Sequence, residues 1–172
     1  SQNLMTMHKS IGVISGKGGG GKTTIAINLA AALHALGENT LLVDANLHAP
    51  HIAQHLGHDG YIDTVHDVLR GTIAPAHAVH LHNSGLKIVP GDKFTREITD
   101  TTRLSLFSQA ASYTIYDAPP GNHQHVLDAV DQVLIVTNPD LPSLTDARRA
   151  IVQAQENNKI IAGIILNKAD KK

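Results

Sequence analysis

Largely apolar runs of strand length alternate with segments of helical periodicity along most of the chain. Most of the runs are continuous rather than alternating, as expected of strands that helices cover on both faces of a parallel sheet. They occupy residues 11–14, 40–43, 86–89, 113–116, 132–137 and 160–166. Helical spacing of apolar residues occupies 24–36, 63–69 and 102–112, and resumes after Ser143. This order predicts an α/β fold with three layers, a mostly parallel sheet with helices on both faces.

The sequence makes more specific predictions for two apolar runs and for the last helix. The longest apolar runs, at 132–137 and 160–166, have the length of buried strands. The last helix is expected to begin with Ser143 as its N-cap and with Asp146, three residues later, as the capping partner.

A glycine-rich loop connects the run at 11–14 to the first helical segment. Its sequence is Gly16-Lys17-Gly18-Gly19-Gly20-Gly21-Lys22-Thr23-Thr24. Glycines let backbone N–H groups approach a polyphosphate, Lys22 neutralises the β- and γ-phosphates, and the Thr23 hydroxyl can hold Mg²⁺. The pattern G-x-x-x-x-G-K-T between a strand and a helix predicts a nucleotide-binding loop formed by these nine residues. The alternative is a flexible glycine linker.

Asp44 follows directly after the run at 40–43. Ligands of open α/β sheets bind beyond the carboxyl ends of the strands, so an acid at this position is well placed to hold Mg²⁺, partly through the waters of the ion. The alternative is a carboxylate that caps a helix or a turn.

Lys17 is not required by a general phosphate-binding loop. With Lys22 it makes the loop resemble the deviant Walker A motif, K-G-G-x-G-K-T-T, of the MinD/ParA family of ATPases. Residues 65–71 and 85–91 resemble the MinD branch, and the resemblance covers 11–167. It implies a P-loop NTPase fold of the SIMIBI type and a homodimer in the ATP state, in which Lys17 contacts the partner's nucleotide. Alternatively, Lys17 only adds charge to its own loop.

Residues 44–50 resemble the first switch of this family, which usually reads D-x-D, but Asn46 stands where the second aspartate is usual. In the family that aspartate helps to orient or activate the attacking water. An amide can orient water but can neither accept its proton nor add charge. The resemblance therefore implies an enzyme that binds Mg·ATP and hydrolyses it weakly. The implied catalytic residues are Lys17, Lys22, Asp44, Asn46 and Asp117.

The segment Asp117-Ala118-Pro119-Pro120-Gly121 resembles the second switch of the family, D-x-P-x-G. The resemblance implies that Asp117 reaches Mg²⁺ through water, as a Walker B acid does, alongside Thr23 and Asp44. It also implies that the Gly121 N–H senses the γ-phosphate. The alternative is a plain turn from a strand to a helix.

Asn167-Lys168-Ala169-Asp170 resembles the base-recognition corner of P-loop proteins. In guanine-binding GTPases the acid of N-K-x-D recognises guanine, whereas in the MinD/ParA family the asparagine faces adenine. ATP is favoured over GTP because Lys17 and the second switch belong to the ATP-using family, and because only two residues follow Asp170. Asn167 is therefore expected to contact the base.

Composition restricts the partners and the location. The 172 residues carry a formal net charge of −1, and no basic run interleaves with aromatic residues, so no nucleic acid is expected as a partner. The absence of cysteine excludes disulfides and thiolate-bound clusters and suits a reducing cytoplasm. Residues 1–8 are expected to form a polar tail and 9–172 a single ATPase domain, short at its C-terminus, with no intrinsic membrane anchor.

The twelve histidines are numerous for this length. His48, His51, His55 and His58 have three- and four-residue spacing, which would place them along one side of a helix where zinc or nickel could bind. Pro50 interrupts that series, and solvated polar positions are the alternative. The remaining histidines are expected mainly in surface loops, among them His77, His80, His82, His123 and His125.

These features favour an ATP-dependent molecular switch of the MinD type, acting with an unidentified regulatory protein in spatial regulation of cell division or of another cell structure. Residues 46–56 also resemble the Mrp branch, which suggests an ATPase that matures metal centres, although the C-X-X-C pair common in that branch is missing. A third hypothesis, supported by Asn46, is a scaffold that binds ATP without hydrolysing it.

Overall fold

The computed structural model describes residues 7–16, 21–58, 60–94 and 97–168. Seven strands alternate with helices along the chain. In chain order the elements are β1 (Lys9–Ile14), α1 (Lys22–Ala35), β2 (Thr40–Asp44), α2 (Ile52–His55), α3 (Val65–Leu69), the 3₁₀ helix η1 (Pro75–Ala78), β3 (His80–Leu81), β4 (Lys87–Val89), the 3₁₀ helix η2 (Thr102–Gln109), β5 (Tyr113–Asp117), α4 (Gln124–Ala129), β6 (Gln132–Thr137), α5 (Leu141–Glu156) and β7 (Ile160–Leu166).

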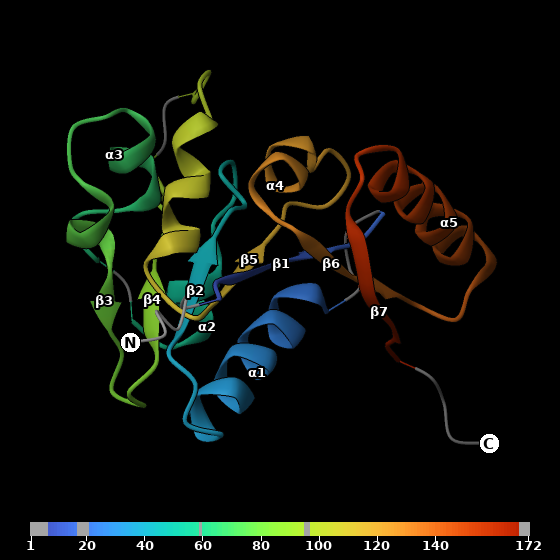
Figure 1. Ribbon diagram of the computed structural model, residues 1–172, viewed down its shortest axis with the longest axis horizontal. Coiled ribbons are helices and arrows are strands. Elements are labelled where there is room, and N and C mark those ends of the chain that lie inside the picture. Colours follow the sequence, from blue (N-terminus) through green and yellow to red (C-terminus); the bar gives the residue numbers. More distant parts are fainter. Residues whose placement is uncertain (1–6, 17–20, 59, 95–96, 169–172) are drawn as a thin grey trace, which may run out of the picture.

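The strands form one sheet in the order β3-β4-β2-β5-β1-β6-β7. Every pairing is parallel except that of β3 with β4. Figure 1 shows α1 on one face of this sheet and α3, α4 and α5 on the other. The mostly parallel three-layer architecture predicted from the sequence is therefore confirmed.

The core consists of two apolar clusters, one on each face of the sheet. One cluster joins α3, η2, α4 and α5 to the sheet, and the other joins α1 and α2 to it. All five residues of β2 are buried, as are the last four of β5, because helices cover both faces there. The central strands thus place their carboxyl ends rigidly at one edge of the sheet.

The expected cap of the last helix is wrong. Helix α5 begins at Leu141, and its N-cap is Asp140, whose carboxylate accepts a hydrogen bond of 2.9 Å from the Ser143 N–H. Pro142 lies in the first turn, where its missing N–H costs nothing, so the helix starts before Ser143. Asp146 lies instead against the glycine-rich loop, where its Cβ packs on Gly16.

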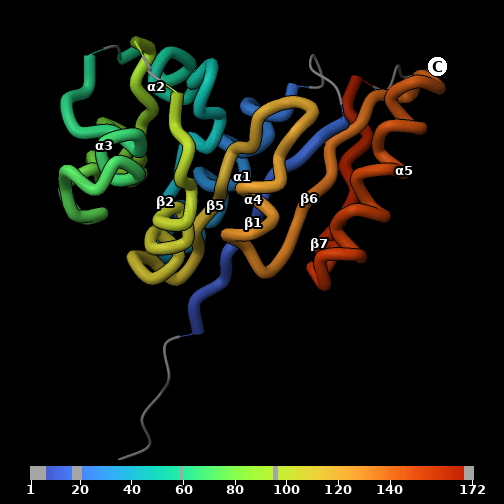
Figure 2. The backbone as a smooth tube through the Cα atoms, turned by 90° about the horizontal axis from the view of Figure 1, so that it is seen from above, coloured from blue at the N-terminus to red at the C-terminus, as the bar shows by residue number. Residues whose placement is uncertain are grey.

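The expected burial of residues 160–166 is also wrong. Strand β7 has the predicted bounds, but it lies at the edge of the sheet and pairs only with β6. Figure 2, which looks onto the sheet from the side of α4 and α5, shows β7 beside α5 at this edge. Ile160, Ile164 and Leu166 are 63%, 55% and 50% exposed. An apolar run indicates a strand, but its exposure depends on the position of that strand in the sheet.

Candidate functional site

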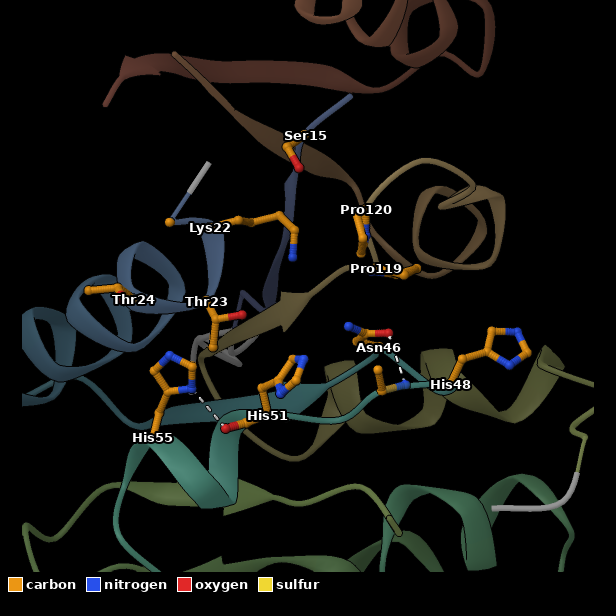
Figure 3. A pocket seen from close by; sticks show the side chains of 12 residues that line it. Ser15, Lys22, Thr23, Thr24, Asn46, His48, His51, His55, Pro119 and Pro120 are labelled. Atoms are coloured by element: carbon orange, nitrogen blue, oxygen red, sulfur yellow. Dashed lines mark hydrogen bonds between the residues drawn. The ribbon is translucent and has the colours of Figure 1, made fainter. Parts of the chain in front are cut away.

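A cavity of about 460 Å³ opens where the central strands end and α1 begins. Figure 3 shows it from close by. One wall comes from the start of α1, a second from the segment after β2, and a third from the segment after β5. The lining residues are Ser15, Gly21, Lys22, Thr23, Thr24, Asn46, His48, Ala49, His51, His55, Pro119 and Pro120.

The glycine-rich loop ends at this cavity. Lys17 and Gly18–Gly20 lie outside the described residues, so their expected roles stay predictions. Gly21 is the N-cap of α1 and has a φ of +72°, in the left-handed region that favours glycine. A Cβ at Gly21 would collide with the side-chain amide of Asn167, and a Cβ at Gly16 would collide with Asp146. The two glycines therefore permit close packing at both ends of the loop.

The first residues of α1 are bound to the end of β5. The Lys22 ammonium group donates a hydrogen bond of 2.9 Å to Oδ1 of Asp117 and another to the Ala118 carbonyl oxygen. The Thr23 hydroxyl donates to the other carboxylate oxygen of Asp117, at 2.8 Å. Lys22 and Asp117 are both buried. The structure therefore brings three of the predicted site residues into direct contact.

Asp44 lies next to Asp117 because both end neighbouring parallel strands and occupy paired positions in the ladder of β2 and β5. Both residues are fully buried. Burial and, secondly, the charge of Asp117 raise the pKa of Asp44 to about 7. The Asp44 carboxylate accepts hydrogen bonds from the backbone N–H groups of Asn46, His51 and Ile52. It therefore also caps the start of α2.

The oxygen donors at this point fit Mg²⁺. The ion prefers oxygen ligands and is usually held by one or two carboxylates together with phosphates and water. Thr23 and the Asp44–Asp117 pair supply a hydroxyl and two carboxylates, and the raised pKa of Asp44 shows that this environment favours neutralisation of the carboxylate charge. A cation here would supply that neutralisation and hold phosphate oxygens.

Asn46 lies on the wall of the cavity opposite Lys22 (Figure 3). It is buried, and its side-chain oxygen accepts a hydrogen bond of 3.3 Å from the Ala49 N–H. Gly121 lies close to the glycine-rich loop, and its N–H donates to the Gly16 carbonyl oxygen at 2.6 Å. The two segments that resemble switches therefore flank the loop in the structure.

Asn167 lies beside the loop, because its amide packs on Gly21. Asp170, the acid of the resemblance to a guanine-binding corner, lies outside the described residues. The placement of Asn167 suits contact with the base of a bound nucleotide, which stays a prediction.

Two histidines hold the segment after β2 from opposite sides, a feature that sequence analysis missed. On one side, Nε2 of His66 lies 2.8 Å from the Leu47 carbonyl oxygen, while Nδ1 of the same ring accepts from the Asp92 N–H. On the other side, Nε2 of His125 lies 2.8 Å from the Ala45 carbonyl oxygen. Carbonyl oxygens only accept, so both rings carry their proton on Nε2. Residues 45–47 are thus tied to α3 and to α4.

His123 corrects the expectation of surface histidines. It is only 2% exposed, and neither ring nitrogen makes a hydrogen bond of normal geometry with the described residues. Burial lowers the pKa of His123, and the nearby Gly121 backbone only partly opposes this. Burial likewise lowers the pKa of His66 and of His125. These imidazoles therefore favour the neutral form in the folded protein.

Acidification is expected to destabilise the fold. Where folding lowers a histidine pKa, the unfolded chain binds more protons, so stability is full above about pH 6.5 and is lost as the pH falls below it. Each such imidazole contributes at most about 1.4 kcal/mol per pH unit. Asp44 opposes this, because its raised pKa gives stability that is lost as the pH rises towards 7. Between pH 7 and pH 5.5 the loss of stability from His66, His123 and His125 should therefore be partly offset by the gain from Asp44.

Urea unfolding at several pH values checks this expectation. His123→Leu should flatten the pH dependence, because it removes a buried imidazole whose ring nitrogens lack normal hydrogen bonds to described residues. The exposed His77, replaced by alanine, is the control and should leave the dependence unchanged. A pH dependence identical in all three proteins would contradict the assignment.

The fold and this site define a P-loop nucleoside triphosphatase. Such proteins have a glycine-rich loop between a strand and a helix, and here the loop joins β1 to α1. A lysine and a threonine follow at the start of the helix, and two acids stand at the ends of neighbouring strands. The profile of the ParA family, described as NUBPL iron-transfer P-loop NTPase, matches residues 6–170. The chain belongs to this family of ParA/MinD-type P-loop NTPases.

Similar proteins include MinD proteins and carriers of iron–sulfur clusters. Septum site-determining protein MinD of Thermotoga maritima is 35% identical over 84% of this chain and 58% of its own length. The iron–sulfur cluster carrier protein of Methanocaldococcus jannaschii is 29% identical over 96% of this chain and 62% of its own length. The structure of MinD of Pyrococcus horikoshii complexed with Mg-ADP superimposes with a TM-score of 0.84 at 29% identity, covering 93% of this chain and 70% of that one. This chain thus spans about three fifths of the length of these two curated relatives.

The described residues contain no helix that combines the length and the apolar character needed to cross a bilayer.

Proposed function

We propose that this chain is a Mg·ATP-dependent molecular switch that dimerises when ATP is bound and hydrolyses ATP slowly. The observation that carries the proposal is the set of contacts between the loop and the second switch. Lys22 and Thr23 both bind Asp117, and the Gly121 N–H binds the Gly16 carbonyl oxygen. A polyphosphate seated on the loop would compete for Lys22 and Thr23, so nucleotide binding would rearrange residues 117–121.

Each site residue has a proposed role that follows from its chemistry. Lys22 and Lys17 stabilise phosphate charge, the second from across the dimer interface, and the backbone of the loop donates hydrogen bonds. Thr23, Asp44 and Asp117 arrange Mg²⁺, which neutralises phosphate charge when bound. Asn46 positions water without taking its proton, the Gly121 N–H senses the γ-phosphate, and Asn167 contacts adenine. Slow hydrolysis suits a switch whose ATP-bound state must persist.

The similarity to MinD proteins supports a role in spatial regulation of cell division or of another cell structure, through a regulatory protein that recognises the ATP-bound dimer. The similarity to carriers of iron–sulfur clusters supports a different output. The family description refers to iron transfer, and carriers of iron–sulfur clusters are about as similar as MinD. These 172 residues contain no cysteine, so thiolate ligands for a cluster would have to come from outside them.

Replacement of Lys17 by alanine is expected to abolish ATP-dependent dimerisation while nucleotide binding persists. The physical reason is that Lys17 contacts the partner's nucleotide, whereas Lys22 holds the nucleotide of its own subunit. Light scattering with Mg·ADP and then with Mg·ATP measures the molar mass. The unaltered chain should double its mass only with ATP.

Lys9→Ala is the matched control, because Lys9 is exposed at the start of β1 and lies over the Tyr113 ring. It should dimerise normally. A Lys17→Ala variant that still doubles its mass would contradict the role of Lys17. An unaltered chain that binds ATP but stays monomeric would favour the scaffold hypothesis instead.

A further inference from the structure

The wall of the nucleotide cavity carries histidines that the proposed ATPase chemistry does not use. His48, His51 and His55 all line it. In Figure 3 the rings of His51 and His55 project towards Thr23 and Thr24, whereas the ring of His48 points to the far side. His58, the fourth residue of the series, packs against Tyr61, with ring centroids 4.3 Å apart and planes tilted by 50°. The spacing does not place all four on one helix, because α2 spans only Ile52–His55, and His51 and His55 form the pair that faces α1.

His51 and His55 have the four-residue spacing that places two imidazoles on one side of a helical turn. The turn is formed, because the His55 N–H donates to the His51 carbonyl oxygen at 3.0 Å. Asp44 holds the start of this turn through the N–H groups of His51 and Ile52. The backbone that carries both imidazoles is therefore anchored to the buried end of β2.

The His55 ring is oriented as in a metal ligand. Its Nδ1 lies 3.0 Å from the His51 carbonyl oxygen, which can only accept, so Nδ1 carries the proton. In the neutral ring Nε2 then has a free lone pair. Histidines that bind metals commonly donate their other ring N–H to a carbonyl or carboxylate in this way, which fixes both tautomer and orientation.

The two rings are close to the separation that a shared ion requires. Their centroids are 6.3 Å apart and their planes meet at 73°. Two imidazoles on one tetrahedral ion, with nitrogen–metal distances of about 2.1 Å, have centroids roughly 5 Å apart. Both side chains are exposed on the cavity wall, so rotation of the His51 side chain can close the difference while the hydrogen bond of His55 keeps its ring in place.

We propose that His51 and His55 bind a divalent transition-metal ion, of the Zn²⁺ or Ni²⁺ class, on the cavity wall that faces Thr23. Among the described residues, no group of three or more histidine, cysteine, aspartate or glutamate side chains is arranged to hold a metal. The protein thus supplies two nitrogen ligands, and water or phosphate oxygens of a bound nucleotide complete the set. Imidazole nitrogen favours these ions over Mg²⁺, so this site is distinct from the carboxylate site at Asp44 and Asp117.

The site itself does not depend on the proposed ATPase function; only its coupling to nucleotide does. An ion on this wall that binds phosphate oxygens strengthens nucleotide binding, and nucleotide must strengthen metal binding by the same factor. The chain would then sense a transition metal and a nucleotide together.

Calorimetric titration of the full chain with ZnCl₂ or NiCl₂, without a histidine tag and after chelation, tests the proposal. We expect one equivalent to bind with micromolar affinity. His55→Ala and His51→Ala should each weaken this binding at least tenfold. His48→Ala is the matched control, because that residue lines the same cavity but points away, and it should bind as the unaltered chain does. Saturating ADP in the absence of Mg²⁺ should tighten the site several-fold.

Several results would overturn the proposal. These are the absence of a stoichiometric site, equal binding by the unaltered chain and His55→Ala, or equal losses in His48→Ala and His55→Ala. A His55→Ala variant that loses nucleotide affinity with no change in metal binding would show that the pair contacts phosphate instead. Thermal melting of the metal-free variants checks that they fold. Dimerisation with Mg·ATP is measured separately in buffer from which transition metals have been removed. A failure to dimerise and a failure to bind Zn²⁺ or Ni²⁺ are therefore distinguishable.

Discussion

Replacing Lys22 by alanine is expected to lower ATP affinity by about 100-fold or more, equivalent to about 2.7 kcal/mol. The Lys22 ammonium group is buried and Lys22 lines the cavity, where it can bind the β- and γ-phosphates of a nucleotide on the loop. Hydrogen bonds to charged groups contribute about 1.5–3 kcal/mol each, and one ammonium group can make several. Equilibrium titration with a fluorescent ATP analogue measures the loss.

The same substitution should also destabilise the nucleotide-free protein. Lys22 is bound to Asp117, and Asp44 lies beside that carboxylate, so removal of the ammonium group leaves two adjacent buried acids without this cation. Breaking a buried ion pair on one side typically costs about 3–5 kcal/mol. Urea unfolding should show this loss, and Mg²⁺ should restore part of it by neutralising the carboxylates.

Two further variants separate the loss of the charge from the loss of the side chain. Lys22→Met keeps the aliphatic chain and removes only the ammonium group, so it should lose ATP affinity and the ion pair with Asp117 as Lys22→Ala does, and any extra destabilisation of Lys22→Ala measures lost packing. Lys9→Ala removes an exposed lysine and should change neither quantity. If Lys22→Met bound ATP like the unaltered chain, Lys22 would serve only to pair with Asp117.

Elements that are specified by a short, continuous sequence pattern could be predicted from the sequence. The bounds of β6 and β7 match the apolar runs at 132–137 and 160–166, and the glycine-rich loop lies where a strand–loop–helix pattern placed it. The shared location of Asp44 and Asp117 was implied by the family resemblance, whereas the strand order that makes β2 and β5 neighbours came from the structure.

Features that depend on distant partners could not be predicted. The His125 ring contacts the Ala45 carbonyl oxygen across 80 positions of sequence, and no periodicity in either segment indicates that contact. The exposure of β7 depends on its place at the edge of the sheet. Strand β3 has only two residues, too few to produce a pattern. The selection of His51 and His55 from twelve histidines likewise required the geometry of the cavity.

Replacing Asn46 by aspartate is expected to accelerate phosphate release on the order of 100-fold, because it adds a group that can accept the proton of the attacking water. Asn46 lines the cavity opposite Lys22, so an aspartate with the same side-chain length would occupy the same place. Single-turnover release of phosphate from Mg·ATP measures the chemical step without interference from product release. Asn46→Ala is the control and should hydrolyse ATP no faster than the unaltered chain.

The carboxylate introduced by Asn46→Asp should also lower the stability of the nucleotide-free protein, and the size of this loss indicates where the new acid lies. Asn46 is buried two residues from Asp44, so a third negative charge would join Asp44 and Asp117 and raise the pKa of Asp44 further. The nucleotide-free Asn46→Asp protein should therefore unfold at lower urea concentration, and Mg²⁺ should offset this more than in the unaltered chain. Loss of stability without faster hydrolysis would place the new acid near the metal site but away from the attacking water. If Asn46→Asp and the unaltered chain released phosphate at the same rate and were equally stable, Asn46 would have no part in the reaction.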